Sequence, residues 1–116
     1  MSIRAEKVSN EIRKAIVKPI SDLANEHNAG LLTITTVHIS KDLRVARVYF
    51  SLMGGKIGKS QFIDILELNK SEIRRHLANT LRLRFVPDLK FFYDDTLDTI
   101  EHIDNLLKKI KSNDSE

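Results

Sequence analysis

Apolar residues recur about every four positions near the start of the chain. These apolar residues are Ile3, Val8, Ile12, Ile16 and Ile20, and charged residues lie between them. This spacing places the apolar side chains on one helical face and predicts an amphipathic helix over residues 2–18. Pro19 is expected to kink or end the helix, because proline lacks the backbone N–H of an interior helical hydrogen bond. Residues 25–30 have the composition of a loop.

Two segments with strand-like patterns follow. Residues 31–39 are rich in Thr, Ile and Val, which favours a β-strand. Residues 40–42 form a short turn, and residues 43–52 alternate between apolar and mixed positions as the second strand of a hairpin. The alternation predicts one apolar face and one mixed face that carries Arg47 and Tyr49.

After a glycine-rich loop the pattern becomes helical again over residues 60–84. The apolar residues at helical spacing are Phe62, Ile63, Leu66, Ile73, Leu77 and Leu81. The repeat is interrupted near Asn69, Lys70 and Ser71, where Asn and Ser are weak interior helix formers, so a kink is expected there. Pro87 disfavours helix in the residue before it, and residues 88–93 alternate as a final strand.

Another amphipathic helix is expected after the last strand. Thr96 is a candidate N-cap, and the apolar residues that follow are Leu97, Ile100, Ile103, Leu107 and Ile110. The predicted order is αββααβ with a helical tail, which indicates a two-layer α+β sandwich. Residues 1–95 are expected to form the domain, and residues 96–116 a C-terminal helical, acidic tail.

Length and composition fit one domain. A chain of 116 residues with 41% hydrophobic residues can build a single core, and a second domain is not expected. The chain has no cysteine, which excludes disulfides, thiolate metal sites and cysteine nucleophiles within it. No long apolar run marks a signal peptide or a membrane span, so a cytoplasmic location without a membrane partner is expected.

The formal net charge of +3 is unevenly distributed along the chain. Residues 1–93 carry 16 Lys/Arg against 9 Asp/Glu, a net charge of +7, whereas residues 94–116 carry 3 against 7, a net charge of −4. A basic body suits a polyanion such as nucleic acid, and the acidic tail would weaken indiscriminate binding. A merely solvated charged surface is the alternative, because the excess is moderate for a nucleic-acid binder.

Much of the positive charge falls on one face of the predicted helix over residues 60–84. If Ile73, Leu77 and Leu81 face the core, helix geometry places Arg75 and Arg82 on the opposite side. With flanking cations and those of the hairpin, the predicted RNA-binding residues are Lys70, Arg74, Arg75, Arg82, Arg84, Lys41, Arg44 and Arg47. Each can neutralise a phosphate, although cations near a helix C-terminus also complement the helix dipole.

Aromatic residues accompany cations on the outer face of the predicted sheet. Tyr49 and Phe92 lie in the same alternating segments as Arg47 and Lys90. Aromatic rings among cations can stack on nucleobases. Simple cross-strand packing of exposed aromatics is an equally good explanation.

Catalytic and metal-binding motifs are not apparent. The segment 54–60 (Gly-Gly-Lys-Ile-Gly-Lys-Ser) approaches a phosphate-binding loop, but Met53 stands where the motif needs glycine, and Ser60 is expected to cap a helix instead. The histidines lack a second ligand at metal-binding spacing; they are His27, His38, His76 and His102. No nucleophile, base and oxyanion site assembles along the sequence, so neither catalysis nor a cofactor or metal is expected.

Several segments resemble the ribosome-binding factor A family in their order and spacing, although no single motif is decisive. They cover nearly the whole chain and are residues 30–43, 46–51, 73–74, Leu81-Arg82-Leu83-Arg84, Val86-Pro87-Asp88-Leu89, Tyr93-Asp94 and 103–107. The resemblance implies a type II K-homology fold, free of catalysis, that binds the immature small (30S) ribosomal subunit and assists late maturation of 16S rRNA. It also implies bacterial cytoplasm, or an organelle of that descent, and often a need during growth in the cold.

The implied partners are 16S rRNA and the free 30S subunit, and the chain is expected to act as a monomer. In that family an Ala-x-Gly element forms the kink between two helices, and Asn69-Lys70-Ser71 aligns with it here. The family's Lys-Asp-Pro-Arg-like element after the first helix has no counterpart in residues 21–28. Two alternatives stay open: a general K-homology-like RNA-binding protein acting away from the ribosome, and a protein-docking module that uses the acidic tail helix.

Overall fold

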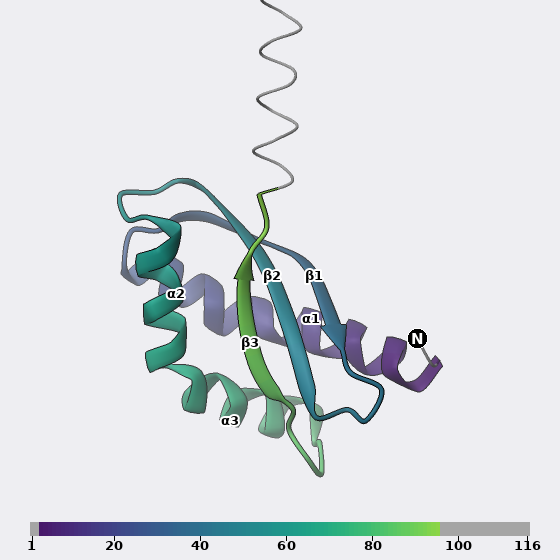
Figure 1. Cartoon of the computed structure of the whole chain (residues 1–116). Coiled ribbons are helices and arrows are strands. Elements are labelled where there is room, and N and C mark those ends of the chain that lie inside the picture. The colour runs from purple at the N-terminus through teal and green to yellow at the C-terminus, as the bar shows by residue number, and fades with distance from the viewer. Residues whose placement is uncertain (1–2, 96–116) are drawn as a thin grey trace, which may run out of the picture.

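The structure is a computed structural model that describes residues 3–95. Along the chain, these residues form α1 (Ile3–Glu26), β1 (Gly30–Ile39), β2 (Val45–Gly54), α2 (Lys59–Leu68), α3 (Lys70–Leu81) and β3 (Asp88–Tyr93). The sheet forms one layer, and the helices lie behind and beside it in Figure 1. The predicted αββααβ order and two-layer α+β sandwich are therefore confirmed. The predicted tail helix that begins at Thr96 lies outside the described residues.

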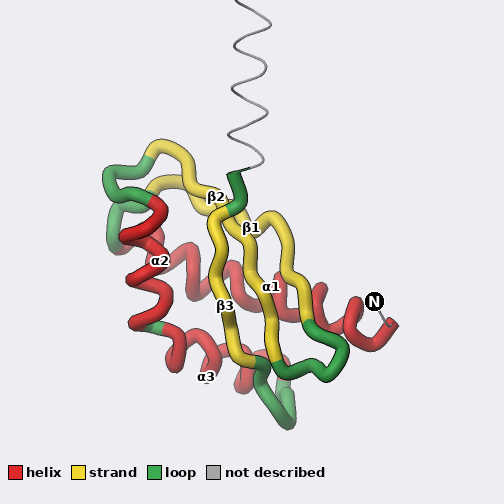
Figure 2. Tube along the Cα trace, in the orientation of Figure 1, coloured by secondary structure: helices red, strands yellow, loops and turns green. Residues whose placement is uncertain are grey.

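The sheet has the strand order β1-β2-β3. β1 and β2 form an antiparallel hairpin with an irregularity between Ile34 and Thr36. β3 runs parallel to β2, with Val45 beside Asp88 at the start of the pairing. Parallel neighbours need a crossover connection, and α2 and α3 supply it, as the tube in Figure 2 shows.

The hydrophobic core lies between the sheet and the helices. Its largest fully buried side chains come from every described helix and strand and include Ile12, Ile16, Ile20, Ile39, Phe50, Phe62, Leu66, Ile73, Leu77 and Leu89. Burial of one such side chain contributes about 1.5–3 kcal/mol to folding. The apolar stripes predicted from the spacing of residues are the faces that point into this core.

The first helix is longer than predicted, and its predicted end at residue 18 is wrong. α1 passes through Pro19 and includes two residues of the segment that was expected to be a loop. The reason lies in the packing beyond the proline. Ile20 and Ala24 continue the buried stripe, at 0% and 1% exposure, and their burial helps offset the roughly 3 kcal/mol that an interior proline costs a helix.

The predicted helix over residues 60–84 is two helices. The expected interruption is confirmed as a break at Asn69, whose side-chain Nδ2 donates a hydrogen bond to the Ile65 carbonyl at 2.8 Å. Lys70 and Ser71 are the first two residues of α3. The predicted cap at Ser60 is wrong, because Gly58 occupies the N-cap of α2 and no side chain caps it there.

The hairpin turn is also longer than predicted. Leu43 has a φ of 61°, so β2 begins at Val45 rather than at residue 43. The Asp42 carboxylate organises the turn by accepting hydrogen bonds from Ser40 Oγ at 2.6 Å and from the Arg44 backbone N–H at 3.2 Å. The hydrogen bond from Ser40, followed by that from Arg44, lowers the pKa of Asp42 below its usual value.

Candidate nucleic-acid interface

The outer face of α3 is basic. Ile73 and Leu77 are buried beneath it, which fixes the rotation of the helix about its axis. Arg75 is exposed on the opposite side, as its spacing predicts, and Arg82 is exposed directly after Leu81, the last residue of the helix. Two small polar residues flank Arg75, with Ser71 one turn before it and Asn79 one turn after it, and they leave room for a close approach. We call this surface the α3 face: Ser71, Arg75, Asn79 and Arg82.

Arg82 ends α3 in an unusual conformation. Its φ and ψ are 51° and 39°, the left-handed region in which glycine is the common residue at a helix C-terminus. A non-glycine residue held there costs on the order of 1–3 kcal/mol. Because the helix stops at Leu81, the prediction that Arg82 and Arg84 lie within the helix is wrong. Arg84 is exposed in the α3–β3 connection instead.

Arg74 has a different environment from the other cations of α3. It is half-buried, and its guanidinium donates hydrogen bonds to the backbone carbonyls of Val86 at 2.8 Å and Pro87 at 3.2 Å. These bonds tie α3 to the segment that leads into β3. Two donor groups of Arg74 are therefore committed within the protein, which leaves less of this predicted RNA-binding residue for a phosphate.

Lys70 is also engaged within the protein. Its Nζ lies 2.8 Å from Glu67 Oε2, across the break between α2 and α3, and its side chain is only 24% exposed. The same ammonium group lies 6.0 Å from the centre of the Phe91 ring. Lys70 thus holds the bend between the helices together, whereas Arg75 and Arg82 face solvent.

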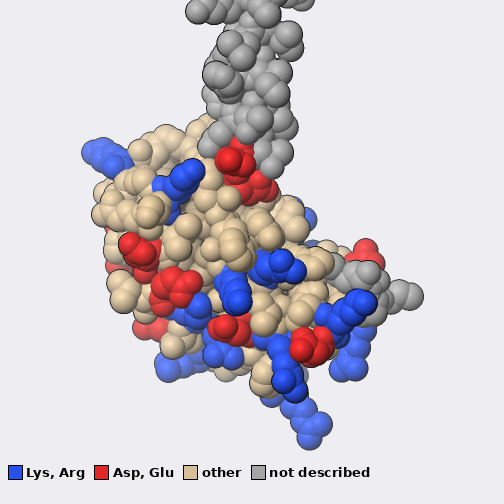
Figure 3. Space-filling view, viewed as in Figure 1, with Lys and Arg blue, Asp and Glu red and all other residues tan. Residues whose placement is uncertain are grey.

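The predicted hairpin cations are exposed. Lys41 and Arg44 lie in the β1–β2 turn, and Arg47 lies on the outer face of β2. Arg44 Nε is 3.9 Å from Asp42 Oδ2, a long and exposed pair that contributes little to stability. Figure 3 shows that Lys and Arg gather over the lower part of the molecule, near α3, the α3–β3 connection and the hairpin turn.

A groove at this end brings together cations that are far apart in the sequence. Arg4 from α1, Arg44 from the hairpin turn and Arg84 from the α3–β3 connection all line it. The sequence reasoning identified the last two but missed Arg4. No local pattern could have found Arg4, because it looks like any other charged residue on the polar face of an amphipathic helix.

The outer face of the sheet carries one basic row and one aromatic pair. The register places His38 beside Arg47 and Arg47 beside Lys90, across all three strands. In the neighbouring row the rings of Tyr49 and Phe92 stack with their centres 5.2 Å apart and their planes 24° apart. This contact is the predicted cross-strand packing, and it occupies one face of each ring.

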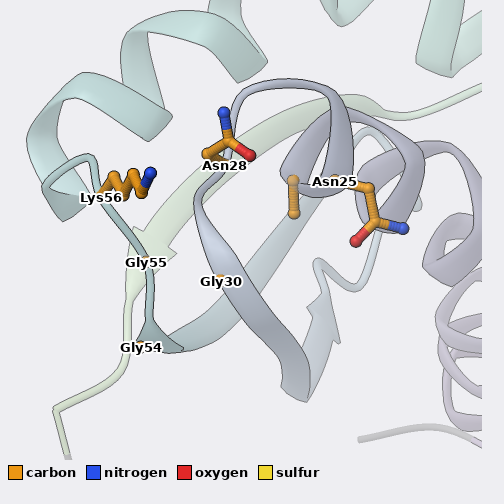
Figure 4. Close-up of a pocket in the computed structure, with 7 residues that line it drawn as sticks. Asn25, Asn28, Gly30, Gly54, Gly55 and Lys56 are labelled. Carbon is orange, nitrogen blue, oxygen red and sulfur yellow. The ribbon is translucent and has the colours of Figure 1, made fainter.

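The glycine-rich loop lies at the other end of the sheet. Its backbone packs closely on the α1–β1 connection, where the Lys56 N–H donates to the Asn28 carbonyl at 2.8 Å. A Cβ atom at Gly55 would lie 1.9 Å from the Ala29 carbonyl oxygen, so this packing requires glycine. Figure 4 shows Asn25, Asn28 and Lys56 around the shallow pocket beside this contact.

Residues 3–95 form neither a metal-binding cluster nor a membrane-spanning helix. Within that span, no three His, Cys, Asp or Glu side chains are grouped so that they could hold a metal ion. No helix of the same span combines the length and the apolar character needed to cross a membrane.

Comparison with known proteins gives consistent matches. The family model of ribosome-binding factor A matches residues 4–107. Ribosome-binding factor A of Macrococcus caseolyticus is 33% identical over 110 residues, which cover 95% of this chain and 96% of that protein.

Two structural matches come from Thermus thermophilus. A crystal structure of its ribosome-binding factor A has a TM-score of 0.65 and 24% identity, covering 77% of this chain and 94% of that one. A homology model of the Thermus thermophilus factor, fitted into a cryo-EM map of its complex with 30S, has a TM-score of 0.62 and 24% identity, covering 74% and 90%.

Proposed function

Because the chain belongs to the ribosome-binding factor A family, we propose that it binds the small (30S) ribosomal subunit and assists the late maturation of 16S rRNA. The family match over residues 4–107, which includes nearly all of the described fold, carries this proposal. The relative from Thermus thermophilus was fitted into a map of a complex with 30S, which supports the same partner for this chain. The protein acts by binding, without turnover, in the cytoplasm.

In this proposal the α3 face lies on rRNA. The exposed guanidinium groups of Arg75 and Arg82 contact phosphates, and Ser71 and Asn79 leave space for the RNA backbone. The bound protein holds a local rRNA conformation until maturation is complete. Its contribution is greatest in the cold, where misfolded rRNA helices rearrange more slowly.

Charge reversal on the α3 face tests this role. Arg75→Glu and Arg82→Glu should each weaken binding to purified free 30S subunits, because a phosphate contact becomes a repulsion. Loss of one phosphate contact should also reduce the salt dependence of binding, with the slope of log affinity against log salt falling by about 1. Co-sedimentation over a range of salt concentrations measures both effects.

Arg13→Glu is the matched control, since Arg13 is exposed on α1 and shares a hollow with Ile34 of β1 rather than with α3. Circular dichroism should show that all three variants keep the wild-type fold. Binding of Arg75→Glu and Arg82→Glu at the wild-type level would contradict the assignment of the α3 face. Binding of the wild-type protein to naked RNA but not to 30S would indicate a general RNA-binding protein instead.

The maturation role needs a cellular readout. Cells that lack the protein should accumulate immature 16S rRNA, most strongly at low temperature, and the wild-type chain should reverse the defect. The Arg75→Glu/Arg82→Glu double variant should not. Normal 16S rRNA processing without the protein would contradict the maturation role while leaving 30S binding in place.

A further inference from the structure

The groove lined by Arg4, Arg44 and Arg84 has the size of a ligand site. It opens where the start of α1, the β1–β2 turn and the α3–β3 connection meet, and its volume is about 460 Å³. Pockets for small ligands usually span roughly 300–1,000 Å³. We call it the triple-arginine groove.

The groove combines strong positive charge with an apolar wall. Arg4, Arg44 and Arg84 are all exposed and provide three guanidinium groups, each able to bind a phosphate through two parallel hydrogen bonds. The acidic residue in the lining is Asp42, whose carboxylate accepts hydrogen bonds from Ser40 and the Arg44 backbone and lies 3.9 Å from Arg44 Nε, a long exposed pair that offsets one of the three positive charges. The groove therefore keeps a net positive charge.

Phe85 adds a flat apolar surface to the same groove. Its side chain is 63% exposed, and it follows Arg84 directly in the α3–β3 connection. The rest of the apolar lining comes from Val8, Leu43, Leu83 and Pro87. An exposed aromatic ring beside arginines is the arrangement by which proteins stack an unpaired nucleobase while holding its phosphates.

We propose that the triple-arginine groove captures one unpaired nucleotide of RNA, with the base against Phe85 and the flanking phosphates on Arg4, Arg44 and Arg84. This proposal rests on the proposed function, in which the chain binds rRNA. Arg82 of the α3 face lies two residues before Arg84, so an RNA backbone that follows the α3 face reaches the groove. An acidic peptide would satisfy the same cations but would leave the Phe85 ring without a planar partner.

A single tryptophan tests the stacking directly. The chain has no tryptophan, so Phe85→Trp creates its only one. A short single-stranded RNA of mixed sequence should quench the fluorescence of this tryptophan, because the base stacks on the indole. An abasic oligonucleotide of the same length offers phosphates without bases and should cause little quenching. Met53→Trp, exposed near the end of β2 beside the glycine-rich loop, is the control and should respond weakly to both.

Truncation and charge removal test the affinity in the otherwise unchanged chain. Phe85→Ala should weaken binding of the labelled single-stranded RNA by roughly 5- to 100-fold, the usual range for loss of one stacked base. Arg4→Gln should weaken it severalfold, with a smaller salt dependence, whereas Arg13→Gln on the same helix should not. Fluorescence anisotropy measures these affinities. All of these side chains are exposed, so circular dichroism should show an unchanged fold.

Four results would overturn the proposal. Equal quenching by the abasic oligonucleotide would show that no base is stacked on residue 85, and stronger quenching by poly-glutamate would identify an acidic protein as the occupant. Phe85→Ala and Arg4→Gln could bind 30S with wild-type affinity while Arg75→Glu binds it weakly. That result would exclude the groove as an RNA-binding site but would leave the proposed function in place. If the wild-type protein bound neither 30S nor RNA, both the groove proposal and the proposed function would be wrong.

Discussion

At the scale of single residues, two neighbouring arginines on α3 have opposite surroundings. Arg74 donates hydrogen bonds to the carbonyls of Val86 and Pro87, whereas Arg75 is exposed on the α3 face. Successive residues on a helix point about 100° apart, so a shift of one position separates a cation that stabilises the fold from one that can meet a phosphate. A count of positive charges cannot make this distinction.

This difference predicts opposite effects of removing the two charges. Arg74→Met should lower the free energy of unfolding by about 2 kcal/mol, because the two carbonyls lose a charged donor. Arg75→Met should change it by less than about 0.5 kcal/mol, as is usual for an exposed side chain, and should weaken 30S binding. Urea unfolding followed by circular dichroism measures the stability. Equal loss of stability in both variants would show that the Arg74 hydrogen bonds do not matter.

At the scale of elements, the ends of the helices depend on what packs beyond them. α1 continues through Pro19 because Ile20 and Ala24 lie in the core. α3 ends at Leu81 although no proline or glycine follows at once, and Arg82 takes the left-handed conformation. The end of α3 therefore combines an unfavourable backbone conformation with an exposed cation, which is the combination that the proposed rRNA contact of Arg82 would account for.

Substitution with glycine should separate these two properties of Arg82. Arg82→Gly should leave the free energy of unfolding unchanged or raise it by up to about 1 kcal/mol, because relief of backbone strain offsets the greater freedom of the unfolded chain. The same variant should bind 30S more weakly. As the comparison, Arg75→Gly lies inside the helix and should lower stability by about 1 kcal/mol. Thermal unfolding that ranks Arg82→Gly below Arg75→Gly would contradict the argument.

At the scale of the whole molecule, packing collects positive charge at one end of the domain. The hairpin turn and the α3–β3 connection, which follows the C-terminal end of α3, meet there, and Arg4 joins them from α1. Residues 1–93 carry a net charge of +7, whereas residues 94–116 carry −4. A basic surface binds any RNA to some degree, so the acidic segment is expected to reduce binding to RNA that is not the target.

Neutralising the acidic segment tests this expectation. The triple change Asp98→Asn, Glu101→Gln and Asp104→Asn should strengthen binding to an unrelated RNA duplex severalfold at low salt, with a smaller effect on 30S. The difference should shrink at high salt, where charges more than a few ångströms apart are screened. Three matched neutralisations within the domain, Glu6→Gln, Glu11→Gln and Asp64→Asn, control for net charge. Fluorescence anisotropy measures the affinity for the duplex. If the three control changes raise this affinity as much as the triple change does, the acidic segment has no special role.

The sequence by itself determined the element order, the limits of β3 and the exposure of Arg75 on the side of α3 away from the core. It could do so because apolar side chains recur with the period of the element they belong to, and burial of each contributes about 1.5–3 kcal/mol. The polar face then follows by geometry. The family resemblance also came from the sequence, through the order of several short segments, and the family match confirms it.

Only the tertiary structure decided which cations act together. The Arg74 guanidinium meets carbonyls of the α3–β3 connection, and Arg4 shares a groove with Arg44 and Arg84. The tertiary structure also decided the extension of α1 past Pro19, because that extension depends on the burial of Ile20 in the core. The physical reason is common to all three. Contacts between distant segments depend on how whole elements pack. The residues that meet in these contacts show no repeating pattern in the sequence.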